Sequence, residues 1–203
     1  MASKQAAVAA CAVLVLSACS ISRPIPAVTT YIVDLPADSA FQSDPGRSTT
    51  LSMGPMHVAA PYADSALVYR LDDVRYVSDP YHAFGAAPGA MLGSRMAAWL
   101  EQTGLFSLVT QPRGVRSAPY LLDTTIVELY GDFREGRPPA AVLVMHFALI
   151  EQVGPPHLIY GRTVARRVDL PRASADALVR GYGTAFAEIL SQIAPEVSAR
   201  AGY

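Results

Sequence analysis

Runs of apolar residues in the second half of the chain predict long β-strands. Three segments, residues 120–133, 140–151 and 158–170, are separated by stretches rich in Pro and Gly, which predicts an antiparallel meander. The middle segment is apolar on both faces, so we expect a central strand with a neighbour on each side. Shorter strands are predicted at residues 30–35, 51–59, 66–71 and 105–109, with residues 74–77 continuing the third or pairing beside it.

Two further segments carry apolar residues at helical spacing. Pro88 suits a first helical turn and Gly104 suits a helix stop, so a helix is predicted over residues 88–103. A second helix is predicted after Ser174, a favoured N-cap, with Asp176 placed where the helix dipole favours an acid. The periodic apolar positions are Leu92, Met96, Trp99 and Leu100 in the first helix and Leu178, Val179, Tyr182, Phe186, Ile189, Leu190, Ile193 and Val197 in the second.

These elements predict an α+β fold, a mostly antiparallel sheet with two amphipathic helices packed on it, one in mid-chain and one C-terminal. A length of 203 residues allows one domain or two small ones, and no repeat or low-complexity tract marks a second. We therefore expect a single domain over residues 29–203. Because 51% of the residues are hydrophobic and 16% are charged, disorder and a long charged coiled coil are excluded.

Charge and cysteine content narrow the function further. The formal net charge is −1 and no block of Lys and Arg occurs, which excludes nucleic acid as the partner. The two cysteines, Cys11 and Cys19, both lie within the first twenty residues. The predicted domain therefore has no pair for a disulfide and no thiolate for a metal site.

The N-terminal residues have the pattern of an export signal. Lys4 precedes an apolar run over residues 6–16, which is too short to span a membrane permanently. The sequence Leu-Ser-Ala-Cys that ends at Cys19 resembles the bacterial lipobox, in which the cysteine is acylated and becomes the first residue of the mature protein. Residues 1–18 are then the signal peptide. The alternative is an ordinary secretory signal with an incidental cysteine.

The residues after Cys19 indicate where the mature protein resides. Ser20 follows the cysteine, and in the lipoprotein sorting pattern that this resembles, serine sends the protein to the outer membrane. Residues 19–28 are proline-broken and without periodicity, which predicts a tether of about 30 Å at ~3.3 Å per residue. We expect a lipid-anchored domain, carrying acyl chains such as palmitate, in the periplasmic leaflet of the outer membrane.

Catalytic and metal-binding patterns are absent from the sequence. The four histidines, His57, His82, His146 and His157, lack ligand spacing, and no metal or cofactor is expected. His146 is interpreted as a hydrogen-bonded core residue in the central strand, and no nucleophile motif is found. The glycines of residues 85–93 lack phosphate-loop spacing and fit a helix start better. Asp72 and Asp73 fit a turn or a solvated edge rather than an acid–base pair.

The stretch over residues 79–84 is the strongest candidate for a binding site. It reads Asp-Pro-Tyr-His-Ala-Phe and leads directly into the first predicted helix. A loop is expected here, and Tyr81, His82 and Phe84 are its candidates for docking a partner. The favoured alternative is that Tyr81 and Phe84 cover the core above the helix.

The overall pattern resembles the ABC-type transport auxiliary lipoprotein family. The resemblance rests on the lipobox, the strand over residues 31–35, the run from Val68 to Leu92, the stretch from Trp99 to Val109, and the segment after Tyr120. It covers about the whole mature domain and is most specific in the residues before Pro88. The family often has Trp where this chain has Phe84, so the role of that side chain does not transfer.

The resemblance implies an accessory component, not an enzyme, of a transporter with an MCE-domain protein, an inner-membrane permease and an ATPase. Such a system moves phospholipid or other apolar molecules between two membranes, and the accessory protein acts by binding, alone or as a homo-oligomer. Two other functions stay open at this point. A self-contained lipid or small-molecule carrier needs an enclosed apolar cavity, whereas a structural or assembly lipoprotein of another outer-membrane machine does not.

Overall fold

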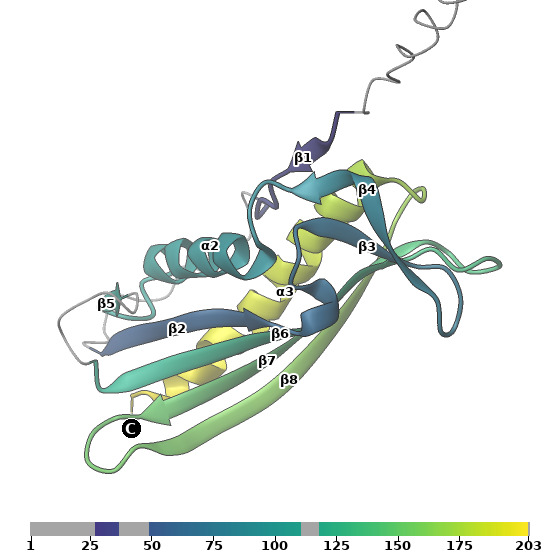
Figure 1. The fold of residues 1–203 in the computed structure, drawn as a ribbon. Helices are drawn as coiled ribbons and strands as arrows, with labels where there is room; N and C mark the ends of the chain where they lie inside the picture. The colour runs from purple at the N-terminus through teal and green to yellow at the C-terminus, as the bar shows by residue number, and fades with distance from the viewer. Residues whose placement is uncertain (1–26, 37–48, 111–117, 203) are drawn as a thin grey trace, which may run out of the picture.

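The computed structural model describes residues 27–36, 49–110 and 118–202. Cys19 and the predicted signal peptide lie outside the described residues, as does most of the predicted tether. Within the described residues the chain forms an eight-stranded sheet and two long helices (Figure 1). The strands are β1 (Thr29–Tyr31), β2 (Thr50–Val58), β3 (Ala66–Arg70), β4 (Tyr76–Phe84), β5 (Leu108–Thr110), β6 (Tyr120–Asp132), β7 (Ala140–Glu151) and β8 (His157–Asp169). The helices are α2 (Pro88–Gln102) and α3 (Ala175–Arg200), with a short 3₁₀ turn, η2 (Ala60–Tyr62).

The predicted meander is confirmed. Strands β6, β7 and β8 pair antiparallel along their whole lengths, and β7 lies between the other two, as expected of a central strand. Gly136 has φ 73° and Gly154 has φ 76°, so a glycine stands in each of the two connecting turns where the backbone is left-handed. These long pairings make the sheet largely antiparallel and confirm the α+β prediction.

The other strands add shorter pairings, several of them parallel. Strands β2 and β3 lie one after the other along the free edge of β6, both parallel to it. Strand β4 continues the sheet antiparallel to β3, and β1 and β5 are three-residue strands at the two ends of this path. Both are shorter than predicted, because residues 32–35 and 105–107 lie outside the strands and bury Val33, Leu105 and Phe106 in the core.

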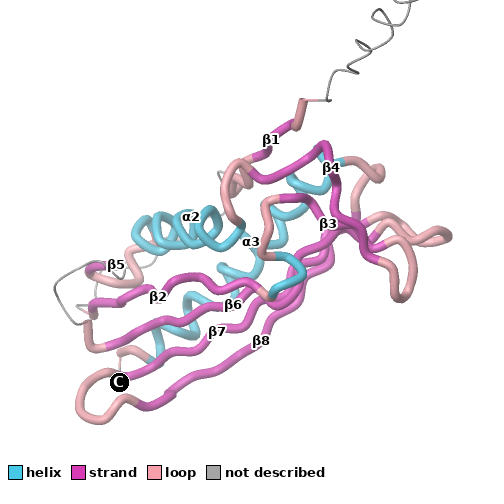
Figure 2. The backbone as a smooth tube through the Cα atoms, in the orientation of Figure 1, coloured by secondary structure: helices cyan, strands magenta, loops and turns pink. Residues whose placement is uncertain are grey.

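Both helices cover the same face of the sheet (Figure 2). Helix α2 packs on β2 and β5, and α3 packs on β7 and β8, so their apolar stripes and the inner face of the sheet form one continuous core. The Ser174 hydroxyl accepts the backbone N–H of Ala177 at 3.3 Å, which confirms the predicted N-cap. The largest side chains that are completely buried in this core are those of Tyr182, Phe147 and Phe186.

The start of α2 depends on a glycine for close packing, a role that the helix-start interpretation did not anticipate. A Cβ atom at Gly89 would lie 2.4 Å from the carbonyl oxygen of Met56 in β2. We expect Gly89→Ala to lower the free energy of unfolding by about 2 kcal/mol, because overpacking outweighs the better helix propensity of alanine. Urea unfolding measures the difference, with the exposed Ser94→Ala in the same helix as the control. An unchanged midpoint would contradict the packing argument.

The opposite face of the sheet is open, which corrects the interpretation of His146. In β7, buried residues alternate with half-buried ones on the other face, and His146 is exposed there. Its Nδ1 atom lies 2.9 Å from the Thr163 hydroxyl on β8. Strand β7 has a neighbouring strand on each side, but only one of its faces is covered. Its apolar sequence therefore predicted the central position correctly and the burial of both faces wrongly.

Candidate functional site

The predicted partner-binding loop is a strand. Tyr81, His82 and Phe84 belong to β4, which pairs with β1 on one side and β3 on the other. Phe84 is buried, with its ring 6.0 Å from that of Tyr182, so it covers the core. Tyr81 is 50% exposed and His82 is partly exposed. The structure therefore separates the three residues: Phe84 faces inward and Tyr81 faces outward.

Asp79 holds this part of β4 in its shape. One carboxylate oxygen accepts the backbone N–H groups of Tyr81 and His82 at 2.7 and 3.1 Å. The other accepts the hydroxyl of Tyr69 at 2.6 Å and lies 2.7 Å from Nδ1 of His82. The β3–β4 register shifts here, so these bonds replace the missing ladder bonds of an irregular strand.

The electrostatics of this cluster agree with its geometry. Burial raises the pKa of the Asp79 carboxyl, but the hydrogen bonds from Tyr69, Tyr81 and His82 outweigh burial and lower that pKa overall. Burial, together with the bond to Asp79, raises the pKa of Tyr69 well above its usual value. A carboxylate beside a histidine supplies two of the three members of a hydrolytic triad, but the hydrogen bonds described for the pair lead to Tyr69 and the backbone, not to a nucleophile.

Removing the Asp79 carboxylate tests whether it organises the strand. Asp79→Ala leaves two side-chain and two backbone donors without their acceptor, so we expect the free energy of unfolding to fall by about 2 kcal/mol. Chemical denaturation provides the measurement, and Asp64→Ala, an exposed acid in the preceding loop, is the matched control. Equal small losses in both variants would show that Asp79 is not an organising residue.

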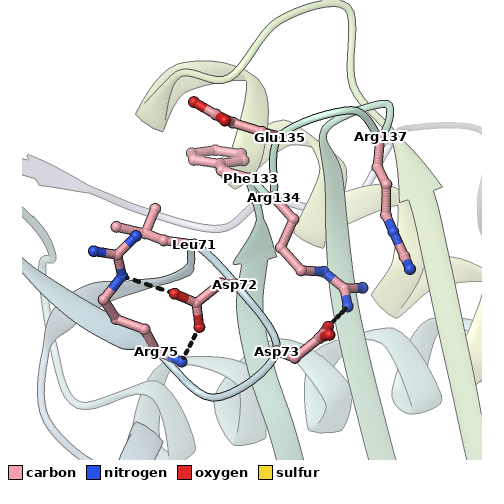
Figure 3. A pocket seen from close by; sticks show the side chains of 8 residues that line it. All are labelled: Leu71, Asp72, Asp73, Arg75, Phe133, Arg134, Glu135 and Arg137. Carbon is pink, nitrogen blue, oxygen red and sulfur yellow. Dashed lines mark hydrogen bonds and ion pairs between the residues drawn. The ribbon is translucent and has the colours of Figure 1, made fainter.

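A cavity of about 560 Å³ opens between the β3–β4 turn and the β6–β7 turn (Figure 3). Arg75 pairs with Asp72 at 3.1 Å, and Arg134 reaches Asp73 across the two turns at 2.8 Å. The size would suit a small ligand, but the lining is polar and its acids and bases are matched in number. The lining residues are Leu71, Asp72, Asp73, Arg75, Phe133, Arg134, Glu135 and Arg137. The cavity therefore has no excess charge to attract a strongly charged ligand, and its lining is too polar to bury an apolar ligand.

The turn prediction for Asp72 and Asp73 is confirmed by these contacts. Asp72 accepts the backbone N–H groups of Val74 and Arg75, which lowers the pKa of its carboxyl. Asp73 is 83% exposed and joins the neighbouring hairpin through Arg134. The two carboxylates thus serve different partners and do not form an acid–base pair.

Arg134, which lines the cavity, also pairs with a buried carboxylate that was not predicted from the sequence. Asp132, at the end of β6, is 1% exposed and accepts two hydrogen bonds of 2.8 Å from Arg134. Arg167 on β8 donates to the same carboxylate at 2.5 Å. The bonds from Arg134, with those from Arg167, hold the pKa of the Asp132 carboxyl well below its usual range. The cluster joins β6 to β8 across the end of β7.

Other kinds of site can be assessed only over the described part of the chain. Within it, no group of three or more His, Cys, Asp or Glu side chains could hold a metal ion. In the same residues, neither helix is long and apolar enough to cross a membrane. The described polar clusters instead support strand ends and turns.

The described residues form an α+β domain in which ion-paired clusters support the hairpins. Its sequence places it more closely: the chain belongs to the family of ABC-type transport auxiliary lipoprotein components, whose sequence pattern matches residues 33–194. The family expected from the sequence is thereby confirmed. Among curated proteins, none matches this sequence significantly.

Solved structures share the fold. A DUF330-family protein from Xanthomonas campestris is similar with a TM-score of 0.69 and 14% identity, over 86% of this chain and 94% of the other. A crystal structure of an uncharacterized protein matches with a TM-score of 0.67 and 20% identity, over 84% and 99% of the two chains. A hypothetical protein from Chlamydia trachomatis matches less closely, with a TM-score of 0.52 and 10% identity over 75% and 99%. At these identities the likeness describes the fold alone.

Proposed function

We propose that this protein is an outer-membrane lipoprotein that serves as the accessory component of an ABC-type system for lipid transport between two membranes. Its partners are an MCE-domain protein and the permease and ATPase of the transporter. The observation that carries the proposal is the family match over residues 33–194, because that family is defined by association with ABC transport. The lipobox at Cys19 and the serine after it support the location.

The protein acts by contact rather than by catalysis. Asp79 and its partners hold β4 to β3, and Asp132 and its partners hold β6 to β8. A lipid crossing the periplasm needs a continuous apolar path, and a rigid domain fixed to one membrane can receive or hold the end of such a path. Acylation of Cys19 then gives the domain its fixed position, since two or three acyl chains bind a bilayer almost permanently.

A pull-down tests the partner. The full chain, tagged at the C-terminus and expressed from its own promoter, is captured after mild detergent solubilisation of the envelope and its partners are identified by mass spectrometry. We expect an MCE-domain protein together with a permease and an ATPase. Recovery of a different outer-membrane assembly, with none of these three, would favour the structural or assembly function instead.

The carrier alternative makes a different demand. A self-contained carrier of apolar molecules needs an enclosed apolar cavity, whereas the described cavity between the two hairpins is open and lined by charged side chains. Extraction of the purified protein in organic solvent, followed by lipid mass spectrometry, separates the two functions. Stoichiometric lipid beyond the acyl chains on Cys19 would support the carrier function.

A further inference from the structure

The pairing of β1 with β4 creates a small apolar surface at one side of the molecule. The two strands are parallel, with Thr29 opposite His82 and Thr30 opposite Ala83. On the inner side, the Tyr31 ring lies 5.9 Å from that of His82, and Phe84 enters the core. Because side chains alternate along a strand, the residues between these point outward. We call this set the outer ribbon face: Val28, Thr30, Ile32, Tyr81 and Ala83.

The outer ribbon face has no charged residue, and all of its residues except the half-buried Ala83 are exposed. Val28 is 53% exposed, Ile32 is 55% exposed and Tyr81 is 50% exposed. These residues are neighbours across the β1–β4 pair, because Val28 and Tyr81 immediately precede the paired residues Thr29 and His82. Ile32 lies over Gly85, where a Cβ atom would be 2.8 Å from its Cδ1 atom. A contiguous patch of Val, Ile and Tyr without a charged side chain is typical of a surface that meets another apolar phase.

The short stretch of chain between this face and the anchor at Cys19 indicates that the apolar phase is the membrane. Val28 follows Cys19 by nine positions, which span at most about 30 Å when the chain is fully extended. The outer ribbon face is thus the described surface that follows the acylated residue most directly. Strand β1 lies beside the start of α3 (Figure 1), and burial, together with Asp176 in the first turn of α3, raises the pKa of the Tyr31 hydroxyl.

The far end of the molecule is well separated from this face. Tyr160 on β8 donates a hydrogen bond to Glu196, twenty residues along α3 from Asp176, which is about 30 Å at 1.5 Å per residue. Two other exposed apolar residues, Val153 and Leu158, lie in the β7–β8 region near that end. They are chemically similar to the outer ribbon face but distant from the anchor, so they provide matched controls.

We propose that the outer ribbon face lies against the lipid surface to which Cys19 is anchored, so that Val28, Ile32 and Tyr81 contact the headgroup region. The inference rests on the lipid anchor in the proposed function and adds the orientation of the domain. Tyr81 suits this place because its ring is apolar and its hydroxyl is polar, the combination that favours membrane interfaces. Lipid, rather than a transporter protein, then occupies the surface on which the sequence analysis placed partner docking.

Site-specific fluorescence tests this orientation in the full, processed protein. Once Cys11 is removed with the signal peptide and Cys19 is acylated, the mature chain has no free thiol. Ile32→Cys and Tyr81→Cys therefore each accept one polarity-sensitive fluorophore, and Val153→Cys is the control. The labelled proteins are reconstituted through their own acyl chains into vesicles of phosphatidylethanolamine and phosphatidylglycerol that contain spin-labelled lipid.

We expect labels at 32 and 81 to show blue-shifted emission and quenching by the spin-labelled lipid, and the label at 153 to show neither. Equal quenching at the three positions, or none at 32 and 81, would overturn the inference. A blue shift that grows with protein density without lipid quenching would also overturn it, because a second copy would then cover the face. The intact mass of the protein shows which proposal has failed. If the protein is acylated but not quenched, only the proposed orientation is wrong, whereas an unacylated protein refutes both the anchor and the orientation.

Discussion

Replacing Cys19 with serine is expected to move the protein from the membrane fraction to the soluble periplasmic fraction almost completely. Serine has no thiol for the thioether bond, so the chain carries no acyl groups. Each buried methylene contributes about 0.8 kcal/mol to membrane binding, and loss of two or three acyl chains removes nearly all of it. The small outer ribbon face is expected to be too weak to hold the domain by itself. Fractionation of the envelope with immunodetection measures the change.

Cys11→Ser provides the control for this experiment. It is the other cysteine in the chain and lies within the residues predicted to be removed as the signal peptide. We expect this variant to remain in the membrane fraction with an unchanged mature mass. If Cys19→Ser also stays membrane-bound after a high-salt wash, the acylation of Cys19 is not what holds the protein there.

The elements that the sequence predicted best are those in which the spacing of apolar residues and the flanking Pro and Gly residues indicate the same element. Residues 140–151 were predicted as the central strand with the observed bounds, because turns rich in Pro and Gly isolate the segment on each side. The first helix was predicted to within one residue at its end, since Pro88 starts it and Gly104, with φ 66°, follows it. Such signals are local, and they are sufficient where the local preference and the packing coincide.

The strand β4 was missed over residues 79–84 because Pro80 argues against a strand and because part of the pairing is distant in the sequence. Pro80 lacks a backbone N–H, and a proline usually excludes a central strand. Asp79 compensates by accepting the N–H groups of Tyr81 and His82, and the short strand β1 completes the pairing from a distant part of the sequence. An Asp followed by Pro in an aromatic stretch was the available signal for this side-chain support.

The candidate sites show the same difference between local contacts, which the sequence predicts, and distant contacts, which it does not. The turn formed by Asp72 and Asp73 was predictable because its hydrogen bonds join near neighbours. The cluster around Asp132 was not, since Arg167 approaches from a strand 35 residues later. The register of β6, β7 and β8 brings these two residues together, and the spacing of residues in the sequence does not reveal that register.

Asp132→Asn is expected to lower the free energy of unfolding at pH 7 by about 3 kcal/mol. The carboxylate is 1% exposed and accepts hydrogen bonds from Arg134 and Arg167, so removing its charge leaves two guanidinium groups without a buried partner. Asparagine keeps the size of the side chain, and the loss therefore reports the charge. Urea unfolding followed by circular dichroism measures it.

Asp73→Asn is the matched control, because Asp73 also pairs with Arg134 but is 83% exposed. Its loss is expected to stay below about 1 kcal/mol, as for other surface ion pairs.

The pH dependence separates charge from shape. Folding lowers the pKa of Asp132, so its stabilisation is complete above the unfolded value of about 3.9 and is lost as the pH falls below it toward the folded pKa. The difference in stability between the natural chain and Asp132→Asn is therefore expected to shrink below about pH 4. A difference that stays constant from pH 7 to the acid limit of folding would mean that Asp132 stabilises the β6–β8 joint by shape and not by charge.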